Sequence, residues 1–294
     1  VTEASRSPHF TFERGTAVTG LIVEEGQVAG VVAKRDDTVF ELRADLIVGA
    51  DGRASAVRKH AEINLAHASP PMDIVWCKLA CPDGWNGVRA FAGRGHLLVA
   101  YHTWDGSLQL GWVILKGTFG DFRSRGIEQW VDEMAHHVTP DLAAHLRENL
   151  NAIQRPFLLS TASDCVQSWC KPGLLLIGDA AHTMSPVGGQ GVNIALRDAI
   201  VAANQLVPVL NRTSIDHTAL ANALHAIERE RMDEVARIQA LQARPPKLIL
   251  TNAWWGEPAR RIAGVLLKRA AVQQRAAGIA RAFAFGVTNV RLTV

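Results

Sequence analysis

One segment, from Gly173 to Asp198, constrains the fold of this chain more than any other. It reads GLLLIGDAAHTMSPVGGQGVNIALRD. Its uninterrupted apolar run, Leu174 to Ile177, is typical of a strand buried on both faces of a sheet that contains parallel pairs. Gly178 and Asp179 follow directly. The sequence therefore predicts a carboxylate at the carboxyl end of a buried parallel strand, which is where open α/β sheets bind their ligands.

Four residues of the turn after this carboxylate put little side chain in the way of a ligand: Pro186, Gly188, Gly189 and Gly191. Backbone N–H groups of such a turn can approach a flat ring closely. An apolar helix is expected to begin near Gln190, and the partial positive charge of its first turn favours a ligand that becomes anionic. Asp179 is placed to accept hydrogen bonds from sugar-like hydroxyl groups.

A second segment, from Asp45 to Arg58, has a related pattern and reads DLIVGADGRASAVR. It predicts a buried strand followed by Asp51-Gly52, with Ser55 and Arg58 beyond. Each segment by itself also fits an ordinary strand-to-helix turn with a capping aspartate. As a pair, with Asp45 to Arg58 (the first motif) before Gly173 to Asp198 (the second motif) and a substrate domain expected between them, they resemble the DG and GD motifs of the FAD-dependent aromatic hydroxylases, the para-hydroxybenzoate hydroxylase-like family.

The resemblance implies an FAD-dependent monooxygenase that uses NAD(P)H as co-substrate. One oxygen atom of O2 would pass from a flavin C4a-hydroperoxide to a small apolar, aromatic substrate. The implied cofactor-binding residues are Asp51, Gly52, Arg58, Gly178, Asp179, Pro186, Gly189, Gly191, Val192 and Asn193. The protein's part in such chemistry is positioning, electrostatics and exclusion of water.

The family assigns separate roles to these residues. Asp179 would bind the ribityl chain, and the backbone from Gly191 to Asn193 would face the pyrimidine edge of the flavin. Pro186 would lie near the reacting face of the ring. Asp51 would sit near the pyrophosphate, and Arg58 would support it or take part in nicotinamide binding. The sequence assigns no catalytic base.

The same reading predicts an α/β fold, with an α+β substrate domain inserted into a partial, Rossmann-like FAD-binding domain. The expected divisions are residues 1–65 (FAD-binding, DG motif), 66–170 (substrate domain), 171–212 (FAD-binding, GD motif) and 213–294 (C-terminal helices). An apolar fraction of 48% is ample for the cores of one or two globular domains.

Residues 11–32 are expected to form short β-rich runs broken at Gly15, Gly20 and Gly26. The substrate domain is expected to be an antiparallel sheet of short strands, with Asp105-Gly106 as the best hairpin turn. The predicted strands are 73–80, 87–92, 96–103, 107–115 and a long last strand, 157–169, and the predicted helices are 127–137 and 140–151.

Two helices are expected after the second motif. The first is predicted to bury a stripe that includes Val192, Leu196 and Ala199. The second is longer and is predicted to stop at Pro245-Pro246. The aromatic residues near the C-terminus are expected to be core, with a pocket cap or a partner surface as the alternative: Trp254, Trp255, Phe283 and Phe285.

No G-x-G-x-x-G turn, which holds the ADP pyrophosphate in the family, occurs in the 294 residues. The sequence is therefore expected to be a fragment, a truncated gene product or one with a mis-assigned start. Two alternatives stay open: an inactive or FAD-deficient remnant, and a flavin reductase or cyclase-like relative that inserts no oxygen. A flavin halogenase is disfavoured because the W-x-W-x-I-P signature is missing.

The net charge of +3 divides unevenly along the chain. From Arg244 onward there are nine Lys or Arg and one Glu, a balance of +8, which leaves −5 for the rest. A solvated helical face is the preferred interpretation, and membrane association is only weakly supported. No nucleic-acid motif accompanies the charge, so no nucleic-acid partner is expected.

The four cysteines match neither a C-x-x-C redox pair nor a standard zinc spacing: Cys77, Cys81, Cys165 and Cys170. Free thiols and no metal site are predicted. His182 is expected to help hold the turn of the second motif rather than to act as an acid or base. The sequence contains no apolar signal segment and no apolar stretch long enough to span a bilayer, and it predicts a cytoplasmic protein of open oligomeric state.

Overall fold

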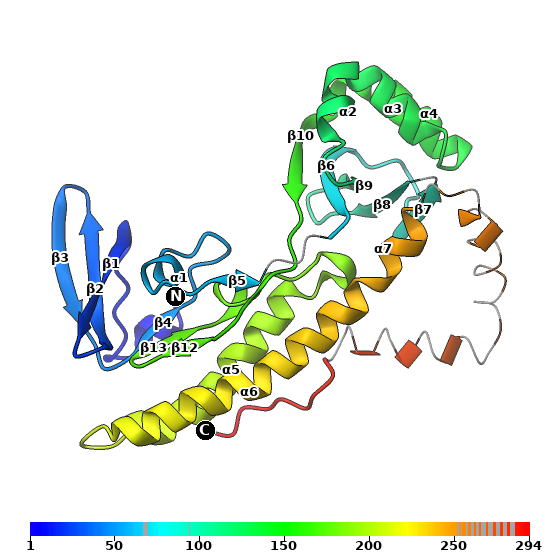
Figure 1. The fold of residues 1–294 in the computed structure, drawn as a ribbon. Coiled ribbons are helices and arrows are strands. Elements are labelled where there is room, and N and C mark those ends of the chain that lie inside the picture. Colours follow the sequence, from blue (N-terminus) through cyan, green and yellow to red (C-terminus); the bar gives the residue numbers. More distant parts are fainter. Residues whose placement is uncertain are drawn as a thin grey trace.

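The computed structural model describes residues 1–66, 70–93, 95–251 and 286–294, and only isolated positions between 252 and 285. The described part is elongated (Figure 1). A small sheet lies at one end, a larger sheet covered by helices lies at the other, and two long helices run between them. Trp254, Phe283 and Phe285, which are expected to be core residues, lie outside the described residues. The same expectation is wrong for Trp255, which is 45% exposed.

The small sheet is antiparallel and follows a short 3-10 turn, Ala4–Arg6. Its strands are β1 (Thr16–Glu24), β2 (Gln27–Arg35) and β3 (Thr38–Arg43), in the order β1-β2-β3. The predicted break at Gly20 is wrong. The strand runs through this glycine, with an irregularity in the register between Val18 and Gly20 that absorbs it.

The parallel strand pair predicted by the second motif, Gly173 to Asp198, is confirmed. Strand β13 (Leu174–Leu176) lies parallel to β4 (Ile47–Gly49), and β12 (Cys170–Lys171) pairs antiparallel on its other side. All three residues of β13 are completely buried. The pairing places the residues that follow β4 beside those that follow β13, although they are far apart in sequence.

The larger sheet is antiparallel and has the strand order β10-β6-β9-β8-β7. Its strands are β6 (Met72–Ala80), β7 (Val88–Gly93), β8 (His96–His102), β9 (Ser107–Leu115) and β10 (Gln154–Ser160). The Asp105-Gly106 hairpin between β8 and β9 is confirmed, and Gly106 has the positive φ of 81° that such turns favour in glycine.

Three helices cover one face of this sheet (Figure 1). They are α2 (Phe119–Arg125), which the sequence does not predict, α3 (Ile127–Ala135) and α4 (Pro140–Glu148), followed by a 3-10 turn, Leu150–Ala152. Trp112 of β9 stacks on Trp130 of α3 with ring centroids 5.7 Å apart. This face of the sheet is therefore filled by protein, which leaves the opposite face for a ligand.

The predicted long strand 157–169 is wrong, because β10 ends at Ser160. The backbone N–H of Thr161 donates to the Asp73 carboxylate, and the Thr161 hydroxyl donates to the carbonyl of Met72. Side chains thus form hydrogen bonds with backbone N–H and C=O groups that would otherwise pair with a longer strand. The chain then forms β11 (Cys165–Val166), which pairs with β5 (Leu65–Ala66).

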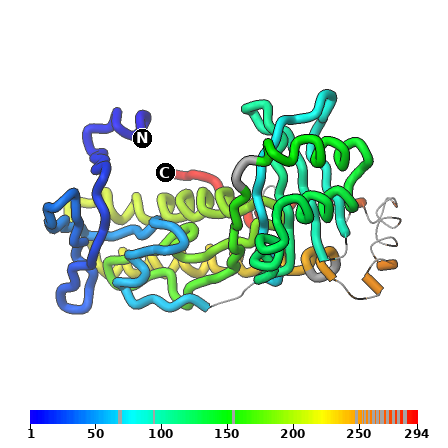
Figure 2. The backbone as a smooth tube through the Cα atoms, turned by 90° about the horizontal axis from the view of Figure 1, so that it is seen from above, coloured from blue at the N-terminus to red at the C-terminus, as the bar shows by residue number. Residues whose placement is uncertain are grey.

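Helices α5 (Gly191–Leu210) and α6 (His217–Gln242) lie side by side along the molecule (Figures 1 and 2). The predicted stop of the second helix before Pro245-Pro246 is confirmed, and both prolines lie in the first turn of α7 (Arg244–Ile249). None of the described helices combines the length and apolarity needed to cross a membrane.

The predicted buried stripe of α5 has the wrong phase. Val192 and Leu196 are 72% and 59% exposed, whereas Ile194, Asp198 and Val201 are buried. The cause is electrostatic: Arg231 Nε of α6 donates to Asp198 Oδ1 at 2.7 Å, so the helix turns its one interior acid toward α6. A prediction based on apolar residues alone does not place Asp198 on the buried side of the helix, and so it assigns the wrong side.

The ion pair of Asp198 belongs to a buried charge network between α5, α6 and the C-terminal segment. Glu234 accepts from Arg231 and Arg197, and its carboxylate also accepts the backbone N–H groups of Val287 and Thr288. Burial alone would raise the pKa of Glu234, but the bonds from the two arginines outweigh it and lower that pKa to about 2.

We predict that this network controls the acid stability of the protein. Since the folded-state pKa of Glu234 lies below its unfolded value of about 4.3, its contribution is complete above that value and is lost as the pH falls toward about 2. Glu234→Gln is expected to lower the free energy of unfolding at pH 7 by about 3 kcal/mol and to flatten its decline in that pH range. Urea unfolding across pH measures both.

The matched control is Glu230→Gln, an exposed glutamate on the same helix. It is expected to leave both the stability and its pH dependence almost unchanged. Equal effects of the two substitutions would show that the network carries no special share of the stability.

Candidate functional site

The first sequence motif forms a capped turn between β4 and helix α1 (Ala56–His60). Asp51 accepts two hydrogen bonds. The Ser55 hydroxyl oxygen lies 2.5 Å from Asp51 Oδ1, and the backbone nitrogen of Val57 lies 3.1 Å from Asp51 Oδ2. Burial raises the pKa of Asp51, but these hydrogen bonds outweigh it, so the net pKa lies below the usual value. Gly52 has a φ of 80°, a conformation that other residues rarely adopt.

Arg58 joins this turn to the second motif. It is 5% exposed; its Nη1 donates to the carbonyl of Ala180 and its Nη2 to that of Arg53, both at 2.8 Å. Arg53 in turn donates through Nε to Asp179 at 3.3 Å. The two motifs are therefore connected by side chains as well as by the β4–β13 pair. Sequence reasoning singles out Arg58 but misses Arg53.

The second motif continues from β13 into a 3-10 turn, Gly178–Ala180. Gly178 has a φ of 58°, and a side chain there would come within 3.2 Å of the Ala195 Cβ in α5. The glycine thus allows the turn to pass close under the helix. The Asp179 side chain is 36% exposed, so its carboxylate is accessible at the edge of the β12-β13-β4 sheet.

His182 and Asp198 hold this turn from within. The His182 ring is completely buried, its Nε2 donates to Asp198 Oδ2 at 2.7 Å, and the same oxygen accepts the Gly178 N–H at 2.9 Å. The ring also stacks on Trp169, with centroids 5.0 Å apart. The predicted structural role of His182 is confirmed. Asp198 is not predicted, although a single acid inside an apolar helix is a signal for it.

The glycine-rich turn runs from Pro186 into a 3-10 turn, Val187–Gly189. Gly188 and Gly189 both have positive φ, and no atom lies within 4 Å of where a side chain of Gly189 would begin. The turn is fixed from α6, because Gln242 Nε2 donates to the carbonyls of Ser185 and Val187 at 2.9 and 2.8 Å. This buried glutamine is a contact that the sequence does not reveal.

Helix α5 begins at Gly191, as predicted, and its start is open to a ligand. Gln190, at the N-cap, makes no capping hydrogen bond; its amide instead donates to the Gly188 carbonyl and accepts from Asn193. The first N–H groups of this 20-residue helix therefore keep the partial positive charge that attracts an anionic group.

An apolar cavity of about 630 Å³ adjoins the glycine-rich turn. It lies between that turn, α7 and the face of the large sheet that α2 to α4 leave uncovered. Among the described residues that line it, Tyr101 carries the only ionisable side chain. The lining residues that carry the argument are Ile74, Trp76, Val99, Tyr101, Val113 and Pro186. The cavity fits a flat, apolar molecule and offers little to a charged one.

Comparison with known proteins agrees with this geometry. The FAD binding domain family matches residues 1–238. The chain is 34% identical over 286 residues to 6-methylpretetramide 4-monooxygenase of Streptomyces rimosus, a match that covers 97% of this chain and 66% of that protein. It is 26% identical over 185 residues to a digeranylgeranylglycerophospholipid reductase of Methanosarcina mazei, covering 60% of this chain and 43% of that one.

The fold is also similar to a solved structure, the OxyS anhydrotetracycline hydroxylase from Streptomyces rimosus. The TM-score is 0.66 at 21% sequence identity, over 96% of this chain and 54% of that one. At this identity the likeness shows the α/β fold alone. The chain thus spans 66% or less of the length of each of these three proteins.

We predict that Arg58 is a structural link between the motifs. Replacing it in Arg58→Met leaves two carbonyls, of Ala180 and Arg53, without their donors, at a cost of about 3 kcal/mol in unfolding free energy. Chemical denaturation measures this loss. Lys59→Met, on the exposed side of the same helix, is the control and is expected to cost less than about 0.5 kcal/mol. A loss no larger than that of the control would refute the link.

Proposed function

The chain belongs to the FAD binding domain family, and from this we propose that it acts as an FAD-dependent monooxygenase. The reaction would insert one oxygen atom of O2 into an apolar, aromatic substrate at the expense of NAD(P)H. The observation that carries the proposal is the placement of the apolar cavity directly against Pro186 to Gly189, the turn of the motif that faces FAD in the family.

The residues present fit FAD. An accessible carboxylate, two glycines of positive φ and an uncapped helix start follow one another along the chain, matching a ribityl chain, a flat ring and an anionic ring edge. We assign Asp179 to the ribityl hydroxyls, and Gly178, Gly189, Gly191, Val192 and Asn193 to backbone contacts with the cofactor. Asp51 and Gly52 are assigned to the pyrophosphate side.

Arg58 has a narrower role in this proposal than the resemblance alone implies. Its guanidinium is buried and donates to two backbone carbonyls, so we assign it to supporting the cofactor site rather than to contacting a nicotinamide. The division into FAD-binding and substrate domains at residues 65, 170 and 212 stays a prediction.

When bound, FAD supplies the redox chemistry by which a nicotinamide hydride and O2 yield an oxygen atom for the substrate. The chain's own residues position the reactants and keep water away. Pro186 presents an apolar surface at the cavity, and Trp76 and Val113 of the sheet line its other side. The start of α5 favours negative charge at the cofactor. No side chain is assigned as a catalytic base.

The cavity favours a substrate of several fused rings. Its volume of about 630 Å³ exceeds what a single ring requires and lies within the range of ordinary ligand pockets. The names of two similar proteins, 6-methylpretetramide 4-monooxygenase and anhydrotetracycline hydroxylase, point in the same direction. We therefore propose a polycyclic phenol as the substrate class.

A reductase is the second candidate, because one similar protein is named digeranylgeranylglycerophospholipid reductase. The two functions differ in product. A monooxygenase yields a product heavier by one oxygen that derives from O2, whereas a reductase adds hydrogen and leaves the oxygen count unchanged. Mass spectrometry of the product formed under ¹⁸O2 with NAD(P)H separates them.

We predict that narrowing the cavity changes the substrate range without changing the cofactor site. Val99→Trp, on β8, places a large ring in the cavity and is expected to lower kcat/KM for a polycyclic phenol at least tenfold, while flavin content stays at the wild-type level. Steady-state kinetics with product analysis measures the effect. The control is Val39→Trp, an equally bulky change at an exposed position of β3.

If Val99→Trp and wild type have the same kcat/KM for a polycyclic substrate, that substrate does not bind in this cavity. Loss of flavin in Val99→Trp would show that the cavity and the cofactor site are not separate.

A further inference from the structure

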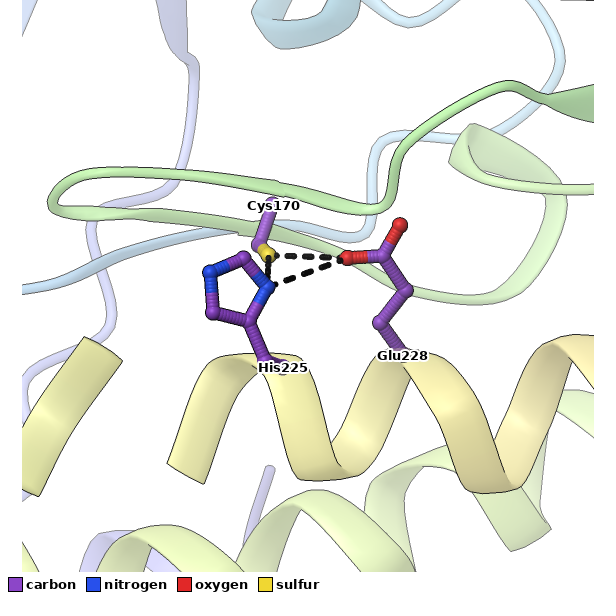
Figure 3. A group of neighbouring side chains, drawn as sticks. All are labelled: Cys170, His225 and Glu228. Atoms are coloured by element: carbon purple, nitrogen blue, oxygen red, sulfur yellow. Dashed lines mark hydrogen bonds and ion pairs between the residues drawn. The ribbon is translucent and has the colours of Figure 1, made fainter. Parts of the chain in front are cut away.

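A side-chain cluster away from the proposed flavin site has the composition of a metal-binding site. Cys170 of β12 faces His225 and Glu228, which lie one turn apart on α6 (Figure 3). Cys170 is buried, Glu228 is half-buried and the His225 side chain is 68% exposed. A sulfur, a nitrogen and an oxygen thus converge at the boundary between the protein interior and solvent.

The spacing of the three donor atoms matches one tetrahedral ion. Cys170 Sγ lies 3.6 Å from His225 Nδ1 and 3.1 Å from Glu228 Oε2, and His225 Nδ1 lies 3.6 Å from the same oxygen. With zinc bond lengths of about 2.3 Å to sulfur and about 2.0–2.1 Å to nitrogen and oxygen, tetrahedral angles put such atoms about 3.3–3.6 Å apart. Shifts of a few tenths of an ångström suffice to bind the ion.

The carboxylate of the cluster is already oriented. Glu228 Oε1 accepts the backbone N–H of Trp169 at 3.2 Å, which turns Oε2 toward the thiol and the imidazole. Hydrogen bonds of this kind fix the ligands of known metal sites. Burial, and then the neighbouring Glu228, raise the pKa of the Cys170 thiol to about 12. In the absence of a cation the thiol therefore stays protonated and donates a hydrogen bond to the Glu228 carboxylate.

We propose that Cys170, His225 and Glu228 bind Zn²⁺ or a divalent transition ion of similar softness. Binding breaks the S–H bond of Cys170, releases that proton to solvent and forms a bond between the metal and the thiolate. Water takes the fourth position on the exposed side of His225. The sulfur and nitrogen ligands select against Mg²⁺ and Ca²⁺, which prefer oxygen.

The site is structural in effect, because it ties β12 to the middle of α6. Strand β12 pairs with β13, and α6 holds the glycine-rich turn through Gln242. An ion here would therefore stiffen the frame on which the second motif rests, without touching the proposed flavin contacts. The sequence hides the cluster, because Cys170 lies more than fifty residues from its two partners.

Titration of the purified chain with Co²⁺ tests the proposal. The signal is read as a difference spectrum against the metal-free sample, so that any flavin absorbance cancels. We expect one ion per chain, a Co²⁺–thiolate charge-transfer band in the near-ultraviolet and the visible bands of tetrahedral Co²⁺. Zn²⁺ is expected to displace the Co²⁺ and to raise Tm, and Mg²⁺ to do neither.

Two variants and one control assign the ligands. His225→Ala, at an exposed position, and Cys170→Ser are each expected to weaken the affinity for Zn²⁺ at least tenfold, and Cys170→Ser also to abolish the charge-transfer band. His217→Ala removes another exposed histidine of α6 and is expected to change nothing. Absence of the thiolate band in wild type, or equal Zn²⁺ affinity of His225→Ala and wild type, would overturn the proposal. Flavin content is expected to be the same in all four proteins, so the outcome is independent of the proposed function.

Discussion

The rest of the structure depends on the hydrogen bonds and the ion pair that the buried carboxylate of Asp198 accepts. One oxygen accepts the Gly178 N–H and the His182 ring, and the other accepts from Arg231. A single acid therefore sets the start of the second motif, the rotation of α5 and the docking of α6. A buried charge of this kind is stable only while every partner is in place, since removal of one leaves the others desolvated and unpaired. The turn that carries Asp179 and the turn that carries Pro186 are thus positioned by the same interior network.

On this frame the two motifs form one site rather than two separate turns. The parallel pair of β4 and β13 aligns their ends, and Arg58 fastens one to the other through backbone carbonyls. Because Arg58 is used in this way, the positive character of the site comes from the start of α5 and from Arg53 rather than from a buried side-chain cation. The apolar cavity lies next to the glycine-rich turn, and residues of α7 line part of its wall. In the function that we propose, cofactor contacts would come mainly from the chain's backbone, and substrate contacts mainly from apolar side chains.

The sequence predicts the parts of this arrangement that depend on local chemistry. The buried run at Leu174, the Asp105-Gly106 hairpin and the start of α5 are confirmed because apolar periodicity and turn residues act over a few positions. The errors arise where distant contacts decide. Asp73 of β6 accepts the N–H of the residue that follows β10, and Arg231 of α6 pairs with Asp198 of α5. Gln242 of α6 donates to a carbonyl next to the glycine-rich turn. The predicted cofactor residues follow from the family resemblance, and their role at FAD stays a prediction.

The most direct test of the account is the affinity of the purified chain for FAD, measured by flavin fluorescence with wild type, Asp179→Ala and Asp83→Ala side by side. Asp83 is an exposed aspartate in the loop after β6 and serves as the matched control. The account predicts that wild type and Asp83→Ala retain FAD with equal affinity and that Asp179→Ala binds it at least tenfold more weakly. Failure of wild type to bind FAD, or equal binding by all three proteins, would contradict the claim that the two motifs form a flavin site around Asp179.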